Sequence, residues 1–344
     1  MFFNGINFTD DSKYAYACAK VRALENKLMS RNDFLRLLEL DHDQIAQFLQ
    51  EHNYKQAEID SENIEFSSII ESEWLNVVRF VSDNIQCNEL TKAMLIRYDF
   101  LNLKILIKDT LRKEKFPDEE AGAPLKLFHA AAVPVEELQN NYWEGNYDRF
   151  PAYLKDSIKI FENIEQLEPS TVDIVLDKLM YKELVDYAVK AKNDFLIKYY
   201  RNTIDVKNIL NLFRLKNLGK EFKDYQNIVM PSGHLDIGTL SKLYSENMDM
   251  IVSRLQYVDY YDEIKAGYEF FVQHNSLSEM ERLFDNWLLE FVKTAKMITF
   301  GPESLIGYFF AKENELKNLR IALTGITNNL EKEMITERLR ENYV

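Results

Sequence analysis

Few residues of this chain have the types and spacing that catalysis or metal binding requires. None of the five histidines lies in an HExxH motif, and none pairs with a cysteine at metal-ligand spacing. The segment Asp41-His42-Asp43 has metal-ligand side chains, but its spacing is too tight for ligands from one helix face. We therefore interpret it as a solvated helix end. The histidines are His42, His52, His129, His234 and His274.

The motifs of the common enzyme classes are also absent from the sequence. There is no Walker-type or dinucleotide-binding glycine motif to hold phosphate, and no nucleophile-elbow motif of the GxSxG kind. Pairs of acidic residues are abundant, but in a chain with this much charge they are usually the solvated faces of helices. The sequence therefore indicates no catalytic residue, no metal site and no cofactor.

The charge and composition exclude further classes of function. A formal net charge of −14 argues against nucleic acid and against direct docking on anionic lipid, since both require a basic face. No apolar run approaches the ~20 residues needed to cross a bilayer, and the N-terminus lacks the basic region of a signal peptide. The two cysteines, Cys18 and Cys87, suggest a reducing cytoplasm and no disulfide framework.

The elements that position these residues are expected to be helices. Only 10 Gly and 7 Pro occur in 344 residues, and apolar residues recur at spacings of three and four. Start signals agree: Ser278 and Glu281 form a capping box at the level of sequence, and Gly301-Pro302 places a proline where a first helical turn accepts it. One apolar stripe comprises Met280, Phe284, Trp287, Leu288 and Phe291.

An internal repeat is the strongest feature of the sequence. Trp74 and Trp287 lie 213 residues apart, as do Lys104 and Lys317, and residues 67–108 align with 280–321 without a gap. A third copy is Asp205-Val206-Lys207-Asn208-Ile209. The repeat predicts three helical modules over residues 1–118, 119–225 and 226–344, each of ordinary domain size. Proline- and glycine-containing stretches at 116–124 and 230–234 are the expected junctions.

The repeated lysines Lys104, Lys207 and Lys317 are the best single-position candidates for a function. One interpretation is structural: each would cap a neighbouring helix or make an ion pair between modules. The other is a ring of three positive charges around a central opening, which would bind a partner. We favour the structural interpretation, because the repetition alone does not require a partner.

Two long segments near the termini resemble signatures of a known family. The segment 301–320, GPESLIGYFFAKENELKNLR, strongly resembles the C-terminal signature of the C subunit of bacterial and archaeal V/A-type rotary ATPases, which is equivalent to the d subunit of the eukaryotic vacuolar enzyme. The segment 14–25, YAYACAKVRALE, resembles its N-terminal signature, although the family usually has arginine where this chain has Lys20. The middle third matches mainly by pattern.

The resemblance implies an all-α fold of three similar V-shaped helical modules, with a pseudo-threefold arrangement that forms a funnel or cup. It also implies a non-catalytic role at the cytoplasmic face of the membrane. The cup would receive the central-stalk shaft subunits, of D and F type, and its underside would rest on the proteolipid rotor ring. Torque from ATP hydrolysis elsewhere would then drive H⁺ or Na⁺ transport. Candidate partner-binding residues are the three lysines and, from the two terminal segments, Arg22 and Arg320.

Two other functions compete with this one. A helical-repeat scaffold of an unrelated soluble complex would make the terminal signatures coincidental. An enzyme with an unrecognised acidic active site would require a catalytic arrangement that the motifs do not reveal. The sequence does not determine which ion is carried, whether the complex runs as a pump or a synthase, or which residues contact shaft or ring.

Overall fold

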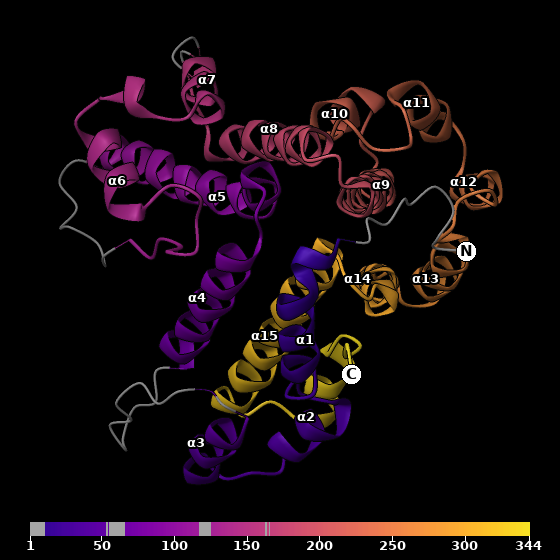
Figure 1. The fold of residues 1–344 in the computed structure, drawn as a ribbon. Coiled ribbons are helices and arrows are strands. Elements are labelled where there is room, and N and C mark those ends of the chain that lie inside the picture. Colours follow the sequence, from indigo (N-terminus) through magenta and orange to yellow (C-terminus); the bar gives the residue numbers. More distant parts are fainter. Residues whose placement is uncertain (1–10, 53, 55–65, 117–124, 162–163, 165) are drawn as a thin grey trace. The chain divides into compact units, whose positions relative to one another are not determined.

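The computed structural model describes residues 11–344 except 53, 55–65, 117–124, 162–163 and 165, and it describes no side chain for residues 42 and 43. Its described residues form helices and contain no strand, which confirms the all-α expectation (Figure 1). The α-helices group by contacts into two compact units, one inserted into the other in sequence: unit 1 is 1–86 with 255–344, and unit 2 is 87–254.

Unit 1 contains the N- and C-terminal helices. They are α1 (Ala15–Glu25), α2 (Arg31–Leu37), α3 (His42–Glu51), α4 (Phe66–Asn84), α13 (Tyr261–His274), α14 (Ser278–Lys293), α15 (Pro302–Thr327) and α16 (Lys332–Arg338), with short 3-10 turns at Ser12–Tyr14 and Thr294–Met297.

Unit 2 contains the middle helices. They are α5 (Asn88–Lys115), α6 (Val135–Trp143), α7 (Ala152–Phe161), α8 (Pro169–Lys190), α9 (Asp194–Asn217), α10 (Phe222–Ile228), α11 (Ile237–Ser245) and α12 (Met248–Arg254), with a 3-10 turn at Tyr147–Arg149. The two units cut across the three repeat segments, so the module boundaries at 118 and 225 stay a prediction.

The core of unit 1 forms around α15, which packs against α4, α14, α1 and α16. The ring centroids of Trp74 and Phe309 lie 4.7 Å apart, which fastens α4 to α15, and Trp287 of α14 packs edge-on against Tyr260 at 5.1 Å. Both tryptophans of the repeat are therefore buried core residues, and their aromatic neighbours differ.

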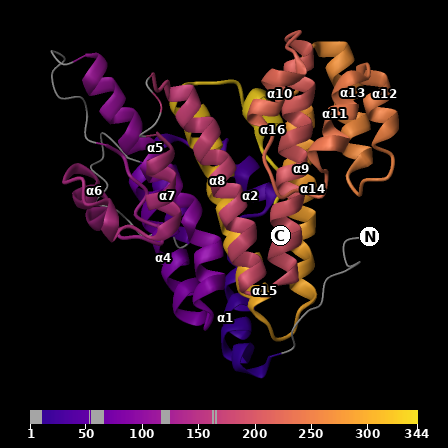
Figure 2. The ribbon, with the colours of Figure 1, turned by 90° about the horizontal axis from the view of Figure 1, so that it is seen from above.

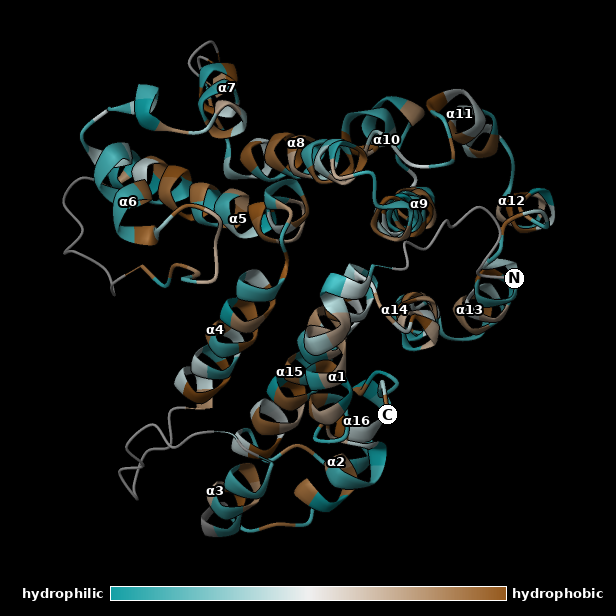
Figure 3. Cartoon of the chain, in the orientation of Figure 1, coloured by the Kyte–Doolittle hydropathy of each residue, from teal (hydrophilic) through white to brown (hydrophobic). Residues whose placement is uncertain are grey.

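The core of unit 2 forms around the pair α5 and α8, with α9 packed on α8. Tyr200 of α9 donates its hydroxyl proton to the carbonyl of Ala93 at 2.6 Å, which ties α9 to the first turns of α5. Near the end of α9, the ring of Tyr225 stacks on Tyr244 with centroids 5.0 Å apart. Figure 2 shows α8 and α9 side by side, and Figure 3 shows that apolar and polar residues alternate around the helices, as the sequence spacing predicts.

The helix starts predicted from the sequence have different outcomes. Helix α15 begins at Pro302 after Gly301, as expected. The capping box at Ser278 is wrong, because α14 begins at Ser278 itself and Leu277 occupies the capping position without a side-chain bond. The Oγ of Ser276 accepts the Ser278 amide proton at 3.3 Å, so the preceding turn supplies the polar partner instead.

No helix in the described ranges is both long and apolar enough to cross a membrane.

Candidate partner-binding sites and the asparagine clamps

Lys104 of α5 is a buried ion-pair residue. Its Nζ lies 2.7 Å from Oδ1 of Asp177 and 3.8 Å from Asp173, both on α8, and the residue is only 9% exposed. Lys108, one turn further along α5, pairs with Asp173 at 2.6 Å. These pairs run along the α5–α8 contact, so Lys104 joins two helices of unit 2.

The other two repeated lysines have different surroundings. Lys317 of α15 is exposed, and its Nζ lies 2.6 Å from Oδ2 of Asp285 on α14. Burial raises the pKa of Asp285, but Lys317 and Arg340 outweigh that effect, so the pKa is lowered overall. Lys207 of α9 is half-buried, with its Nζ 5.9 Å from the ring centroid of Tyr181 on α8. The three lysines aligned by the sequence repeat therefore have three different environments.

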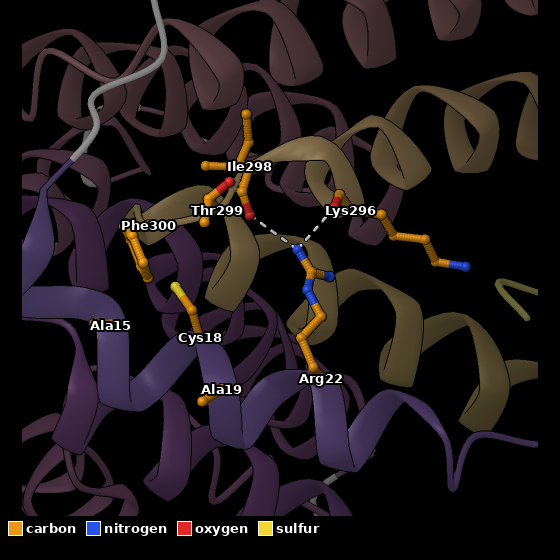
Figure 4. Close-up of a pocket in the computed structure, with 8 residues that line it drawn as sticks. All are labelled: Ala15, Cys18, Ala19, Arg22, Lys296, Ile298, Thr299 and Phe300. Carbon is orange, nitrogen blue, oxygen red and sulfur yellow. Dashed lines mark hydrogen bonds between the residues drawn. The ribbon is translucent and has the colours of Figure 1, made fainter.

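Arg22 is engaged inside unit 1. Its guanidinium donates to the carbonyls of Lys296 at 2.9 Å and Ile298 at 3.0 Å (Figure 4). It also pairs with Glu25 at 2.7 Å. Glu25 in turn accepts a hydrogen bond from the hydroxyl of Tyr343 at 2.9 Å. Arg22 therefore connects α1 to the loop before α15, while Glu25 connects α1 to the C-terminal residues.

Arg320 and Lys317 are both exposed, but Lys317 is paired with Asp285, so Arg320 is the exposed predicted residue whose charge could meet a partner protein. It lies on α15, and within the described part of the chain it has no hydrogen-bond or ion-pair partner. Of the five predicted residues, it is the one whose side chain is free to meet another protein without first losing an internal bond.

The sequence motifs did not reveal a repeated hydrogen-bond arrangement, which we call the asparagine clamps. Each clamp is a buried asparagine on a long helix, and its side-chain amide both donates to and accepts from the backbone of one downstream residue. Asn102 of α5 binds Phe128 at 2.9 and 2.7 Å, Asn208 of α9 binds Met230 at 2.9 Å in both directions, and Asn318 of α15 binds Arg340 at 3.0 and 2.9 Å. A side-chain amide used this way satisfies a donor and an acceptor that burial would otherwise leave unpaired.

An acidic residue precedes each clamp asparagine by three positions, on the same face of its helix. Asp99 accepts the amide proton of Val133 at 2.9 Å and the hydroxyl proton of Tyr153 at 2.6 Å. Asp205 accepts the amide protons of His234 and Leu235 at 3.1 and 3.0 Å. In both cases the acid and the asparagine hold the same downstream segment. Burial raises the pKa of Asp99 to about 7 and that of Asp205 to about 6.

The third acid, Glu315, belongs to a buried charge cluster in unit 1. Its carboxylate accepts from the Met29 amide at 2.5 Å and the Tyr54 hydroxyl at 2.6 Å, and it lies 2.7 Å from Nζ of Lys312. Lys312 also lies 3.1 Å from Glu73 of α4, and its side chain is 5% exposed. This cluster joins α15, α4 and the N-terminal segments of the unit.

The clamps correct the register of the repeat. The ungapped alignment places Asn102 on Glu315, whereas the hydrogen bonds place it on Asn318, three residues later. Because three residues are almost one helical turn, the wrong register still sets apolar positions on apolar positions. Consequently Lys207 and Lys317 are equivalent, and Lys104 lies one turn beyond its supposed place. The acid-x-x-Asn spacing shared by 99–102, 205–208 and 315–318 was the signal that could have shown this.

Unit 1 also contains a small pocket between α1 and the loop before α15 (Figure 4). It has a volume of about 280 Å³ and is lined by Ala15, Cys18, Ala19, Arg22, Ile298 and Phe300, among others. The Cys18 thiol donates to the carbonyl of Gly301 at 3.4 Å. On the α1 side Ala15, Cys18 and Ala19 are small, whereas Arg22 and Lys296 place charged side chains in the lining.

The described residues contain no group of three or more His, Cys, Asp or Glu side chains placed to hold a metal ion. For the segment Asp41-His42-Asp43, the side chains of His42 and Asp43 lie outside the described part of the structure.

The family-model match and the individual relatives of this chain indicate the same protein family. Residues 17–338 match the model of the ATP synthase (C/AC39) subunit family. The chain is 27% identical to the C subunit of the A-type ATP synthase of Methanosarcina mazei, over 95% of this chain and 93% of that protein. It is 24% identical to the C subunit of the V-type sodium ATPase of Enterococcus hirae, over 94% and 97%. The chain therefore belongs to the ATP synthase (C/AC39) subunit family.

Proposed function

We propose that this protein is the non-catalytic central-stalk subunit of a V/A-type rotary ATPase. In that role it connects the rotating shaft subunits, of D and F type, to the proteolipid ring, and it passes torque between them for H⁺ or Na⁺ transport. It is a peripheral subunit at the cytoplasmic face of the membrane, and its three modules form a cup around the end of the shaft.

The observation that carries this proposal is the family match, which spans almost the whole chain, together with relatives of similar length named as C subunits of A-type and V-type ATPases. A match of this extent leaves little of the chain for a separate catalytic domain. The relatives differ in their names between ATP synthase and sodium ATPase, so the ion and the direction of operation are not part of the proposal.

The internal bonding supports a body that resists deformation. Each of the long helices α5, α9 and α15 is fastened to a downstream segment by a clamp asparagine, and α15 is also joined to α4 by the buried Lys312 cluster. Torque passes through a protein efficiently only if its elements do not slide, and buried, mutually satisfied polar groups in a close-packed interior oppose sliding.

Arg320 is our first choice for a partner contact within the predicted set, because it is exposed and has no internal bond among the described residues. Lys104 and Arg22 are engaged by Asp177 and by backbone carbonyls, so their replacement would affect packing first. Charge reversal by Arg320→Glu should weaken assembly without lowering the thermal midpoint. Arg338→Glu, at another exposed arginine of unit 1, is the matched control.

The test is affinity purification of the tagged chain from gently solubilised membranes, followed by mass spectrometry. Recovery of shaft, catalytic-head and proteolipid subunits together is the expected result. Recovery of soluble proteins alone would contradict the proposal. A second arm removes the protein from cells: if the catalytic head stayed attached to the ring and still drove transport, the coupling role would be excluded.

A further inference from the structure

The C-terminal ends of α9 and α15 form the same turn, at positions spaced in sequence as the clamp asparagines of these two helices are. Gly219, at a φ of +64°, donates its amide proton to the carbonyl of Lys216 at 3.0 Å. Asn329, at a φ of +52°, donates to the carbonyl of Ile326 at the same distance. Each turn leads into a helix of seven residues, α10 after α9 and α16 after α15. The two ends are therefore corresponding parts of two copies of the repeat.

The side chains at these two corresponding ends differ in charge. Residues 214–223, which we call the basic corner, contain four basic residues and one acidic residue, whereas residues 324–333 contain one basic residue and two acidic residues. Because the end of α15 forms the same turn without this positive charge, folding of the turn does not require it. The basic residues of the corner are Arg214, Lys216, Lys220 and Lys223.

Two lysines of the basic corner have charges that no internal bond uses. Lys220 and Lys223 are exposed, and neither side chain has a hydrogen-bond or ion-pair partner in the described part of the chain. The neighbouring acids are bonded within the first turn of α10, where Glu221 and Asp224 form a capping box. On a chain with a formal net charge of −14, the corner is thus a local positive site that attracts carboxylates.

Tyr244 of α11 holds the basic corner in position. Its carbonyl accepts a hydrogen bond from Nζ of Lys216 at 2.8 Å, and its hydroxyl donates to the carbonyl of Lys220 at 2.8 Å. The ring centroids of Tyr244 and Phe222 lie 5.8 Å apart. Helix α10 packs against both α9 and α11, and the three lie together in Figure 1. The backbone of the corner is therefore ordered before any partner binds, which lowers the entropic cost of binding.

The basic corner also exposes an apolar side chain at its turn. Leu218 is 62% exposed, the highest value among the described large hydrophobic side chains of unit 2. The corresponding residue at the end of α15 is the polar Asn328. Covering an exposed leucine contributes favourable free energy through the burial of apolar surface. The corner therefore differs from its counterpart in apolar exposure as well as in charge.

We infer that the basic corner is a docking site for an acidic segment of another protein subunit. Carboxylates of that segment meet Lys220 and Lys223, and an apolar side chain of the segment covers Leu218. A narrow protein segment fits better than an anionic membrane, because a broad surface would also meet the acidic residues of this chain. The inference rests on the proposed function in one respect, since the partner is taken to be a subunit of the same rotary ATPase.

The first experiment measures how fast lysine amines are acetylated in the free chain and in the purified complex. Acetylation of Lys220 and Lys223 should slow by about tenfold on assembly, because an amine covered by a partner is shielded from the reagent. Lys192, an exposed lysine just before the start of α9, is the internal reference. If Lys220 and Lys223 react as fast in the complex as in the free chain, the inference is wrong.

The second experiment replaces the basic corner by its counterpart. Leu218→Asn, Lys220→Leu and Lys223→Glu together introduce the residues found at the corresponding positions after α15, where the same turn forms. When this triple variant is co-expressed with the wild-type chain, its share of the purified complex should be about tenfold lower, with an unchanged thermal midpoint. Lys190→Glu with Lys192→Glu, at two exposed lysines before the start of α9, is the control and should assemble normally. Equal shares of the triple variant and the wild type would overturn the docking site.

The nature of the partner is tested with salt and with lipid. Retention of the wild-type chain in the complex should weaken as salt is raised, and the triple variant should lose most of this dependence. The same salt dependence in both proteins would overturn the acidic partner. Flotation with vesicles that contain anionic lipid tests the membrane alternative. If the free wild-type chain bound these vesicles and the triple variant did not, the corner would be a lipid site and the inference would be overturned.

The two proposals fail in different ways. A wild-type chain that assembles normally while Lys220 and Lys223 stay reactive refutes the docking site alone. Failure of the wild-type chain to assemble with the shaft and ring subunits refutes the proposed function itself.

Discussion

The clamps of unit 2 and the clamp of unit 1 share one geometry and differ in electrostatics. In all three, the side chain of an asparagine on a long helix hydrogen-bonds the backbone of a downstream residue, and an acidic residue lies three positions before the asparagine. In unit 2 the acids Asp99 and Asp205 are satisfied by backbone amides and, for Asp99, by a tyrosine hydroxyl. In unit 1 Glu315 has a buried lysine as its partner.

This difference separates two ways of keeping a carboxyl group inside a protein. Burial outweighs the hydrogen-bond donors at Asp99, and at Asp205 it outweighs the donors together with the attraction of Arg201, so the pKa values of both carboxyl groups rise. A buried cation compensates the charge directly, but it commits the structure to keeping both partners, because either one alone would be an uncompensated buried charge. Loss of one partner of the acid is therefore expected to destabilise unit 1 more than unit 2.

The largest expected effect is loss of the cation in unit 1. Lys312→Met would leave the buried Glu315 and the half-buried Glu73 without their partner, and we expect a loss of about 3–5 kcal/mol of unfolding free energy. Urea unfolding at neutral pH measures it. Lys293→Met, which removes a lysine from a more exposed pair with Glu290, is the control and should cost less than about 1 kcal/mol. Equal losses would show that the cluster is not electrostatically coupled.

The next effect is a pH dependence that belongs to unit 2. The pKa of Asp99 is about 7 in the folded protein and near 3.8 when unfolded, because burial raises it. As pH rises from about 4 to about 7 the unfolded state ionises first, so the wild type loses stability across this window and is then constant above it.

Asp99→Asn removes this titration. The difference in unfolding free energy between the variant and the wild type should therefore shift in favour of the variant by about 2–4 kcal/mol across that window. Urea unfolding of both proteins at several pH values measures the difference, in which the other titrating groups cancel. The titratable side chains that interact with Asp99 are Tyr153 and Tyr187. A difference independent of pH would mean that the donors from Val133 and Tyr153 cancel the effect of burial on the pKa of Asp99.

A smaller effect follows from breaking one clamp. Asn208→Ala would remove both bonds to Met230 and leave a backbone donor and acceptor unpaired, at a cost of about 1–3 kcal/mol. Amide hydrogen exchange should show faster exchange at Met230 than in the wild type. Asn217→Ala, at the exposed end of the same helix, serves as the control. Unchanged exchange at Met230 would show that other contacts hold this segment.

The smallest effect compares two of the repeated lysines. Lys104→Met removes an almost fully buried ammonium from Asp177 and should cost about 1–3 kcal/mol, whereas Lys317→Met removes an exposed one from Asp285 and should cost about 0–1 kcal/mol. Thermal midpoints of the two variants test the order. A reversed order would mean that the pair of Lys317 and Asp285 contributes more to stability than its exposure indicates.

The helical class and the start of α15 were predictable, because both depend on local properties. Apolar residues at spacings of three and four specify a helix wherever they occur, and proline fits the first turn regardless of what packs on it. Ser278 shows where local rules fail. Its sequence suits a capping box, which would need the helix to begin at the next residue, but α14 begins at Ser278 itself and the amide of Ser278 donates to Oγ of Ser276.

The sequence by itself determined that this chain is an all-helical, repeated protein of the ATP synthase (C/AC39) subunit family, since periodicity and long signatures are written in consecutive residues. Only the tertiary structure decided the register of the repeat and which partners its charged residues bind. A helix tolerates a shift of three residues without changing its apolar face, so the pattern cannot choose between registers. The choice is made by contacts such as Asn102 with Phe128 and Lys312 with Glu73, which join residues far apart in the chain.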